Sequence, residues 1–383
     1  MTVTLPSVSS VKSVVPNPAW ASLPLFDRTG WKRMAFGEFA ESIGERAEPR
    51  DAQEEIYVGL EHLDPQCLHI RRWGKGSDVI GGKLRFRKGD IIFGKRRAYQ
   101  RKLAVSEFGG ICSAHAMVIR ARPDKVLPEF LPFLMMSDRF MNRAVEISVG
   151  SLSPTINWTT LKLETFDLPP LDQQRRIAEI LWAVDEQQQA NLAVVESLNE
   201  LNLAKKSKWL DADSLDYPRK SLTEICDPTQ WQTISQRELE ESGVPVFGAN
   251  GYIGFFHTAN HQSDTIAITC RGSTCGTVNW IPGPSYITGN SMCLENLIDE
   301  LDQRYLFEIL LHLNMRMVIT GSAQPQITRA SLASLRVPLP PIKVQRAWVS
   351  ELAVLRSANE QATTHATNTA QLSRAMNEQL TAP

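Results

Sequence analysis

Long hydrophobic runs are missing from this sequence of 383 residues. A membrane-spanning helix needs about 20 consecutive apolar residues, and not even about 18 occur in a row, so we expect no membrane span. The first 20 residues contain one lysine, and prolines stand where a secretory signal would have its apolar core, so secretion is not expected. These two absences favour a cytoplasmic protein.

Cysteine is scarce, and catalytic motifs are absent. The six cysteines are irregularly spaced, which is not typical of a disulfide framework and indicates reduced thiols. The pairs Cys112–His115 and Cys270–Cys275 lack a second pair at zinc spacing, so we predict no metal site. Residues 76–83 depart from P-loop spacing, and there is no H-E-x-x-H, no dinucleotide-binding G-x-G-x-x-G and no Asn/Asp-Pro-Pro-aromatic motif for methylation of a base. We therefore expect a protein that is not an enzyme and has no cofactor of its own.

The chain has no excess of charge of one sign, because its formal net charge is −1. The distribution of charge is uneven, however. Between Lys83 and Lys102 there are nine basic residues and one acid, whereas residues 211–383 hold 12 Lys and Arg against 17 Asp and Glu. Any surface for a polyanion is therefore expected mainly in the first half of the chain.

What the sequence does contain is a long internal repeat. The segment Gly150–Leu181 recurs 171 residues later, without a gap, as Gly321–Leu352, with 11 identities in 32 aligned positions. The shared pattern is G-S-x-x-P-x-I, then Leu-Pro-Pro, then Gln-Arg after three further residues. A repeat at this spacing is too long for a solenoid unit of about 20–50 residues. It indicates a duplicated module, each copy a globular domain that leads into a helix.

The chain between the repeated segments reads as short strands and helices. Strands are predicted at 56–60, within 83–95, at 109–121, at 265–269 and at 277–281 from their apolar or alternating patterns. Helical spacing marks 127–147 and its counterpart 300–320. Asp90–Gly94 and Asp264–Ile268 occupy comparable positions in the two modules, so the duplication extends upstream of the clear repeat.

A long helix is predicted after each Leu-Pro-Pro, because proline prevents a helix from continuing through it. The first, at about 172–209, has a heptad frame that is apolar at six of ten positions. That frame comprises Ile177, Leu181, Val184, Gln188, Asn191, Val195, Leu198, Asn202, Lys205 and Trp209. The second helix has a weaker seam. An ordinary amphipathic core helix is the alternative to a coiled coil, but the length of the helix favours the coil.

The run GKRRAYQRK at 94–102 is the strongest candidate for binding nucleic acid. Arginine and glutamine form bidentate hydrogen bonds with guanine and adenine, lysine and arginine neutralise phosphates, and tyrosine packs against sugar or base. The candidate contacts are Lys95, Arg96, Arg97, Tyr99, Gln100, Arg101 and Lys102. The alternative is a solvated basic hairpin.

The second module has a weaker candidate loop at Cys270–Gly276. Its possible contacts are Arg271, Ser273 and Thr274, and a tight turn between strands is the alternative. The two polar loops of the repeat add Ser151 and Ser322, which either bind phosphates or only fix the angle between module and helix.

Taken together, these motifs resemble the specificity subunit of type I restriction–modification systems. The resemblance extends from Trp31 to about Leu380 and rests on the repeated G-S-x-x-P-x-I, Leu-Pro-Pro and Gln-Arg elements. It implies an α+β fold with two small mixed α/β target-recognition domains, each followed by a long helix. The two helices would pair as an antiparallel coiled coil, with a pseudo-two-fold internal duplication.

On that basis the expected organisation is a lead-in at 1–30, recognition domains at 31–170 and 213–341, and spacer helices at 171–212 and 342–383. Each domain would read one half of a bipartite, asymmetric site on double-stranded DNA, and the helices would set the gap between the halves.

The resemblance also implies partners. Two modification (methyltransferase) subunits would dock near the domains and helices, and restriction (helicase–nuclease) subunits would join for cleavage; these partners would carry S-adenosylmethionine, ATP and Mg²⁺. The repeated pairs Gln174, Arg175 and Gln345, Arg346 are the expected docking residues. There are two rival hypotheses. One is an enzyme, a nuclease or a methyltransferase, that uses scattered acids such as Asp78, Asp90 and Glu107, and the other is a coiled-coil assembly protein whose modules bind protein or RNA.

Overall fold

The computed structural model describes residues 25, 27–53, 55–210, 217–321 and 324–381. The chain divides into two compact units, one of Met1–Leu192 with Thr364–Pro383 and one of Ala193–Thr363. Most of the expected lead-in at 1–30 and the predicted junction around 212 lie outside the described residues, as does Ser322.

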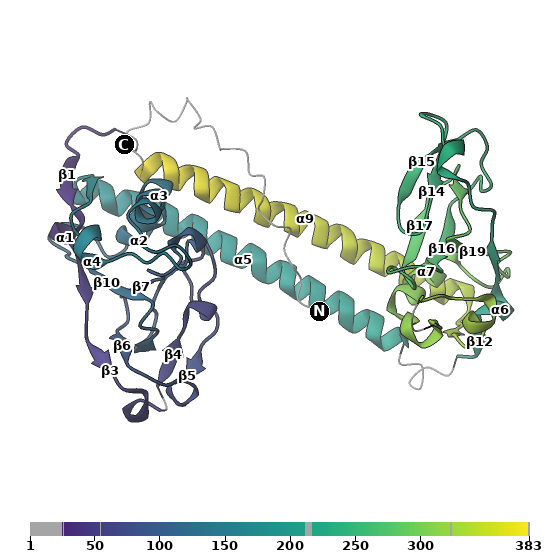
Figure 1. Ribbon diagram of the computed structural model, residues 1–383, viewed down its shortest axis with the longest axis horizontal. Coiled ribbons are helices and arrows are strands. Elements are labelled where there is room, and N and C mark those ends of the chain that lie inside the picture. The colour runs from purple at the N-terminus through teal and green to yellow at the C-terminus, as the bar shows by residue number, and fades with distance from the viewer. Residues whose placement is uncertain (1–24, 26, 54, 211–216, 322–323, 382–383) are drawn as a thin grey trace. The chain divides into compact units, whose positions relative to one another are not determined.

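The first unit contains three sheets (Figure 1). A two-stranded antiparallel sheet pairs β1 (Lys32–Ala35) with β11 (Thr165–Leu168). An antiparallel four-stranded sheet has the order β2 (Ala40–Ile43), β10 (Met117–Ala121), β7 (Ile91–Phe93) and β8 (Leu103–Val105). A five-stranded sheet has the order β3 (Arg46–Ala47), β6 (Lys83–Phe86), β9 (Gly110–Cys112), β4 (Ile56–Val58) and β5 (Gly74–Lys75).

Short helices complete the first module, and their aromatic side chains form its core. These helices are α1 (Phe36–Phe39), α2 (Leu131–Met136), α3 (Asp138–Glu146) and α4 (Trp158–Leu161). Phe36 packs against Phe140 and Phe166 with ring centroids 5.3 and 5.9 Å apart. The helix predicted at 127–147 is divided at Ser137, whose extended backbone ends α2 and whose hydroxyl accepts a hydrogen bond from Phe140 N at 3.2 Å. A serine N-cap starts a new helix in this way even where the apolar spacing continues.

The second unit repeats part of this architecture. Its two-stranded sheet pairs β12 (Arg219–Ser221) with β20 (Arg336–Pro338), and its four-stranded sheet has the order β13 (Asp227–Gln230), β19 (Ser291–Glu295), β16 (Thr265–Thr269) and β17 (Val278–Ile281). A three-stranded sheet has the order β15 (Tyr252–Phe256), β14 (Val244–Phe247) and β18 (Tyr286–Ile287). The helices are α6 (Leu222–Ile225), α7 (Gln303–His312) and α8 (Arg329–Leu332), with a 3-10 turn at Met315–Val318.

The two modules therefore share two of their sheets and differ in the third. Each has one two-stranded and one four-stranded antiparallel sheet, and the strands that form them come in the same chain order. The first module adds a five-stranded sheet, whereas the second adds a three-stranded one. The duplication predicted from the repeat is confirmed at the level of the fold.

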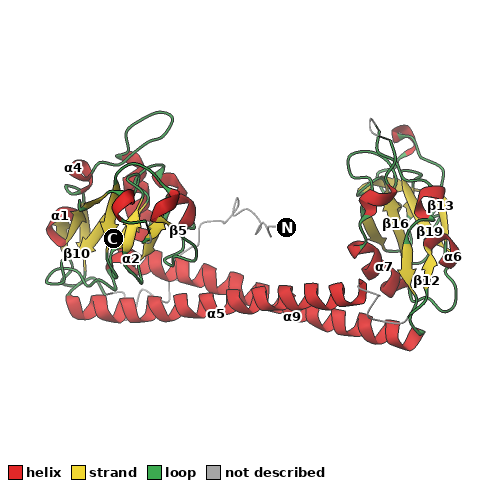
Figure 2. Cartoon of the chain, turned by 90° about the horizontal axis from the view of Figure 1, so that it is seen from below, coloured by secondary structure: helices red, strands yellow, loops and turns green. Residues whose placement is uncertain are grey.

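A 40-residue helix follows each Leu-Pro-Pro: α5 (Leu171–Leu210) and α9 (Ile342–Thr381). The two helices run side by side in both views (Figures 1 and 2). Cross-helix hydrogen bonds join Asn191 to Thr369 at 3.0 Å in the first unit and Asn199 to Asn359 at 3.1 Å in the second. The partner's number falls as the residue number rises, so the helices are antiparallel.

The heptad seam of α5 is confirmed where it is described. Nine of the ten seam residues have described side chains, and all nine are buried or half-buried. Ile177 and Leu181 are fully buried and belong to the core of the first module. The first three turns of the helix, as far as Leu181, are thus part of the globular domain, which fixes where the helix leaves it.

Candidate nucleic-acid interface

The basic run lies in the connection from β7 to β8 and has a fixed backbone. Arg97 and Arg101 both have left-handed backbones, with φ of 58° and 52°, and they flank a 3-10 turn at Ala98–Gln100. The side chain of Ala98 is buried in the core of the module. A left-handed arginine costs free energy that the surrounding structure must offset, and the buried Ala98 anchors the turn that the two arginines flank.

The polar loop of the repeat lies directly against this basic loop. Ile156 N donates to Lys95 O at 3.0 Å, and Arg97 N donates to Pro154 O at 2.8 Å. Arg96 and Thr155 form an isolated antiparallel bridge. Two segments about 55 residues apart in the sequence therefore form one surface. The sequence of neither loop predicts this contact by itself.

The exposed side chains of this surface differ in chemistry. Arg97, Tyr99, Ser151 and Leu152 are exposed, with Leu152 at 92%. Lys95, Arg96 and Gln100 are half-buried. The surface combines cations with a tyrosine and a leucine, as expected for contacts to both phosphates and bases.

Arg96 is oriented by a neighbouring histidine. Its Nη1 lies 3.2 Å from Nε2 of His115. Burial, and then the charges of Arg96 and Lys95, hold the pKa of His115 below its usual value. The imidazole is therefore neutral near pH 7, and its free Nε2 accepts the arginine N–H.

Arg101 and Lys102 do not face outward with the rest of the run. Arg101 Nη1 contacts Asp138 at 2.5 Å and Nη2 donates to Met136 O at 2.8 Å, while Lys102 Nζ donates to Leu60 O at 2.6 Å. This corrects the expectation that the entire 95–102 segment points toward a ligand. Their cations stabilise the module, and the available contacts end at Gln100.

The second module builds the same junction from other residues. Ile327 N donates to Cys270 O at 3.0 Å, and Arg271 bridges to Gln326. Because Ile327 repeats Ile156, Cys270 is equivalent to Lys95 and Arg271 to Arg96. This register differs by one residue from the upstream correspondence of Asp90 with Asp264 inferred from the sequence.

The loops after β7 and β16 both have a left-handed residue at the same position. Gly272, with φ of 87°, takes the position of the left-handed Arg97. Arg271 and Ser273 are exposed, whereas Thr274 is half-buried and its carbonyl accepts two hydrogen bonds from Thr277. The scaffold is conserved between the modules, and one cation remains where the first module has three.

The repeated glutamines have a structural role. Gln174 is buried, accepts from Leu127 N at 2.8 Å, and donates to Lys125 O at 3.1 Å and Pro169 O at 2.9 Å. Gln174 thus joins the start of α5 to the loop before α2, and Gln345 joins the start of α9 to the loop before α7.

Gln345 makes the equivalent three bonds, to Asp302 N at 2.8 Å, Glu300 O at 2.7 Å and Pro340 O at 2.8 Å. This corrects the expectation that Gln174 and Gln345 lie on a docking surface. Their neighbours Arg175 and Arg346 are exposed, with Arg346 Nε 3.6 Å from Asp302.

The signal for these structural residues was present in the repeat. Ile156 and Ile327 both bury their side chains in the core of their module, which favours an apolar residue at this position, and their backbone N–H groups donate the hydrogen bonds that join the two loops. Thr155 and Gln326, which form the bridges to the arginines, differ between the copies and carried no signal.

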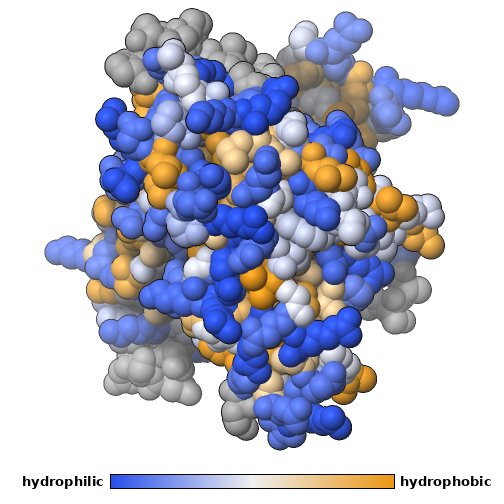
Figure 3. Space-filling model, turned by 90° about the vertical axis from the view of Figure 1, so that its left-hand side faces the viewer, coloured by the Kyte–Doolittle hydropathy of each residue, from blue (hydrophilic) through white to orange (hydrophobic). Residues whose placement is uncertain are grey.

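Figure 3 shows a face that is mostly hydrophilic, with hydrophobic residues distributed singly or in small groups. No helix among the described residues is long and apolar enough to cross a membrane.

Comparison with known proteins identifies the family. The family model of the type I restriction modification DNA specificity domain matches twice, at residues 30–200 and 215–368. The specificity subunit of the Escherichia coli type I restriction enzyme EcoDI is 30% identical over 191 residues, which cover 46% of this chain and 41% of that subunit. The chain thus matches less than half the length of this relative.

A putative specificity subunit of the Methanocaldococcus jannaschii enzyme MjaX is 23% identical over 333 residues, covering 76% of this chain and 78% of that protein. The type I restriction–modification S subunit from M. genitalium has the same fold, with a TM-score of 0.61 at 17% identity over 92% of this chain and 96% of that one. A chain from a structure of type I restriction–modification complex assembly has a TM-score of 0.58 at 22% identity, over 92% and 97%.

Both modules are covered by the family model, and the solved structures share the arrangement of two mixed α/β modules and paired long helices. The chain belongs to the family of type I restriction–modification DNA specificity proteins, and it contains two copies of the specificity domain.

Proposed function

We propose that the chain is the sequence-specific DNA-binding subunit of a type I restriction–modification complex that recognises a bipartite, asymmetric site. Each module reads one half-site on double-stranded DNA, and the paired helices α5 and α9 set the gap. The observation that carries the proposal is the junction of two loops, built on Arg96–Thr155 in one module and Arg271–Gln326 in the other.

The two junctions support asymmetric reading because they share a backbone and differ in side chains. Equivalent hydrogen bonds at Ile156 and Ile327 fix both loops to their modules. The first loop presents Arg96, Arg97 and Tyr99, while the second presents Arg271 and Ser273. Identical frames with unlike contacts favour unlike half-sites.

Linking two readers explains why each is small. One mismatched base pair costs about 1–3 kcal/mol, so a short half-site alone gives limited discrimination. A second DNA-binding module at fixed spacing multiplies this discrimination, because binding of the first module raises the effective concentration of the second at its half-site. We infer that the buried contacts of Gln174 and Gln345 keep each module rigid on its helix.

The proposed partners are two modification (methyltransferase) subunits and the restriction (helicase–nuclease) subunits. The chain's near-zero net charge supports this division, because a protein with few free cations has modest affinity for phosphates by itself. S-adenosylmethionine, ATP and Mg²⁺ would belong to those partners, and this chain would be non-catalytic. Arg175 and Arg346, exposed at the first turn of each long helix, are the proposed docking contacts.

The test is binding of the full chain, with its methyltransferase subunit, to duplexes selected from a randomised library. The double variant Arg96→Ala/Arg97→Ala should lose at least about tenfold in affinity for the selected duplex, since a good base contact contributes about 1–3 kcal/mol. It should lose less on shuffled duplexes.

The matched control is Arg50→Ala/Arg87→Ala, which removes the same charge from the first module at side chains that are 81% and 67% exposed. We expect a small and sequence-independent loss. Equal losses for both double variants would show that only charge matters, and preferential binding to RNA or protein would favour the assembly-protein alternative.

A further inference from the structure

Three chemically unlike ligand groups converge in the second module, outside the proposed interface. They are His261, in the segment between β15 and β16, and Cys293 and Glu295, which lie two residues apart on β19. One ligand atom from each lies within 4.8 Å of the other two. We propose that these residues form a zinc-binding site.

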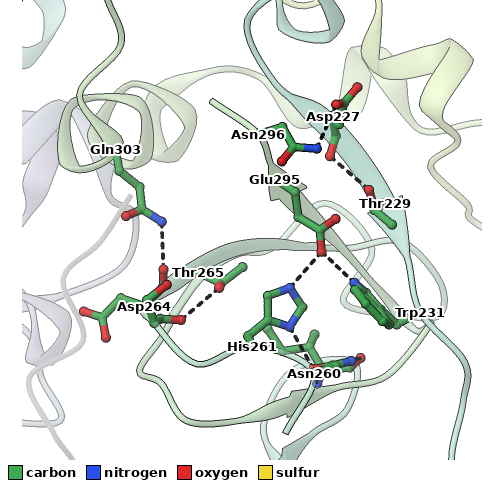
Figure 4. A network of polar contacts seen from close by, with 12 residues as sticks. Asp227, Thr229, Trp231, Asn260, His261, Asp264, Thr265, Glu295, Asn296 and Gln303 are labelled. Carbon is green, nitrogen blue, oxygen red and sulfur yellow. Dashed lines mark hydrogen bonds and ion pairs between the residues drawn. The ribbon is translucent and has the colours of Figure 1, made fainter. Parts of the chain in front are cut away.

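The protonation of His261 is fixed by its neighbour Asn260. The amide of Asn260 accepts from Ile287 N at 2.9 Å and donates to Ile287 O at 3.0 Å, which defines its orientation. Its Oδ1 therefore faces His261 Nδ1, at 2.8 Å (Figure 4). Since an amide oxygen only accepts, Nδ1 must carry a proton.

The other ring nitrogen then faces a carboxylate. His261 Nε2 lies 2.9 Å from Glu295 Oε1, and a neutral imidazole protonated at Nδ1 has only a lone pair there. Two acceptors at this distance require a cation between or beside them, either a proton or a metal ion. A histidine that donates one N–H to an oxygen and directs the other nitrogen inward has the usual arrangement of a metal ligand.

Cys293 distinguishes the metal ion from the proton. An imidazolium–carboxylate pair needs no third group, yet the thiol of Cys293 points into the same cluster. Its residue is fully buried, and none of the described residues forms a hydrogen bond with its sulfur. The thiol is thus available as a ligand.

The carboxylate is also held in place. Trp231 Nε1 donates to Glu295 Oε1 at 2.6 Å, and the indole ring stands edge-on to His261 with centroids 5.6 Å apart. None of the described residues bonds to Oε2, which leaves that oxygen for a cation. Figure 4 shows the tryptophan and the histidine directed at this carboxylate, with the amide of Asn260 on the far side of the histidine ring.

The ligand set selects zinc. Thiolate with imidazole is typical of Zn²⁺ sites, whereas Mg²⁺ and Ca²⁺ prefer oxygen ligands only. The side chains of His261 and Glu295 are 9% and 22% exposed, so the site is largely shielded from solvent. With three protein ligands, the fourth position of a tetrahedral zinc ion would be left for water. Bound zinc would join two segments that are distant in the sequence, the one that carries His261 and β19.

The proposal goes beyond DNA recognition and does not depend on it. Its test uses the full chain without DNA, stripped with a chelator and titrated with Zn²⁺, then with Co²⁺ as a spectroscopic probe. We expect one zinc per chain, a raised thermal midpoint with zinc, and thiolate-to-cobalt charge-transfer absorption.

Cys293→Ala and His261→Gln should each abolish stoichiometric binding. The matched control is Cys226→Ala, which removes another buried thiol of the same module that is not part of the cluster. Binding retained in Cys293→Ala, or lost equally in the control, would overturn the proposal. Should a variant fail to fold, the wild-type cobalt spectrum decides, since absorption without a thiolate band excludes Cys293 as a ligand.

Discussion

Gln174→Ala offers a direct test of the role assigned to the repeated glutamines. The substitution removes three hydrogen bonds and leaves Leu127 N, Lys125 O and Pro169 O without their side-chain partner. At about 1 kcal/mol for each bond the loss is about 3 kcal/mol, and more where a backbone group stays buried and unsatisfied.

Hydrogen exchange at Leu127 measures this loss locally. Because about 1.4 kcal/mol corresponds to a tenfold change in an equilibrium constant, 3 kcal/mol should raise the opening of this amide about 100-fold. Mass spectrometry of the peptide around residue 127 gives the rate. Gln345→Ala should act in the same way on the amide of Asp302.

The control is Arg175→Ala, an exposed neighbour on the same helical turn, which should leave the exchange rate unchanged. Unchanged exchange in Gln174→Ala, together with lost binding of the methyltransferase subunit, would refute the structural role and restore the docking hypothesis for this residue.

Two further predictions concern the contacts that hold each module to the long helices. The hydrogen bond with Asp185 on α5, which outweighs the effect of burial, raises the pKa of His69 above 6.5. A histidine whose pKa is higher in the folded than in the unfolded protein stabilises the fold fully when the pH is below the unfolded-state pKa. This stabilisation is lost as the pH rises through the folded-state pKa. The first unit should therefore lose stability as pH rises from about 6.5, and His69→Gln should remove that slope in thermal melts, whereas an unchanged slope would contradict it. In the second unit, the buried Glu308 contacts Lys206, at 3.4 Å, and Arg356. Glu308→Ala should therefore lower the free energy of unfolding, measured with urea, by about 3–5 kcal/mol. A decrease below about 1 kcal/mol would exclude a significant role for these ion pairs.

The frame of the protein could be predicted from the sequence because the repeat encodes it. Leu-Pro-Pro marks the start of both long helices, and the G-S-x-x-P-x-I loop marks the junction that carries Arg96 and Arg271. The role of the repeated glutamines could not be predicted in the same way: identity between the copies suggested docking, whereas the structure shows equivalent buried hydrogen bonds in the two modules.

Details that depend on tertiary contacts could not be predicted. Arg101 looked like its neighbours in the basic run, but the left-handed turn at 97–101 directs it to Asp138, which is 37 residues away in sequence. The cluster of His261, Cys293 and Glu295 has no metal-site spacing along the chain, because its residues come together only where β19 pairs with β16, the strand that follows the segment with the histidine. The expectation of no metal site followed from spacing alone.

We propose above all that two unlike modules read two halves of one DNA site. Its most direct test is methylome sequencing of cells that express the matching methyltransferase with the wild-type chain, with Arg96→Ala/Arg97→Ala, or with neither. We expect a methylated motif with two specified halves and a constant gap, which disappears without the chain and relaxes in only one half with the variant. A contiguous motif, or methylation that is the same without the chain, would contradict it.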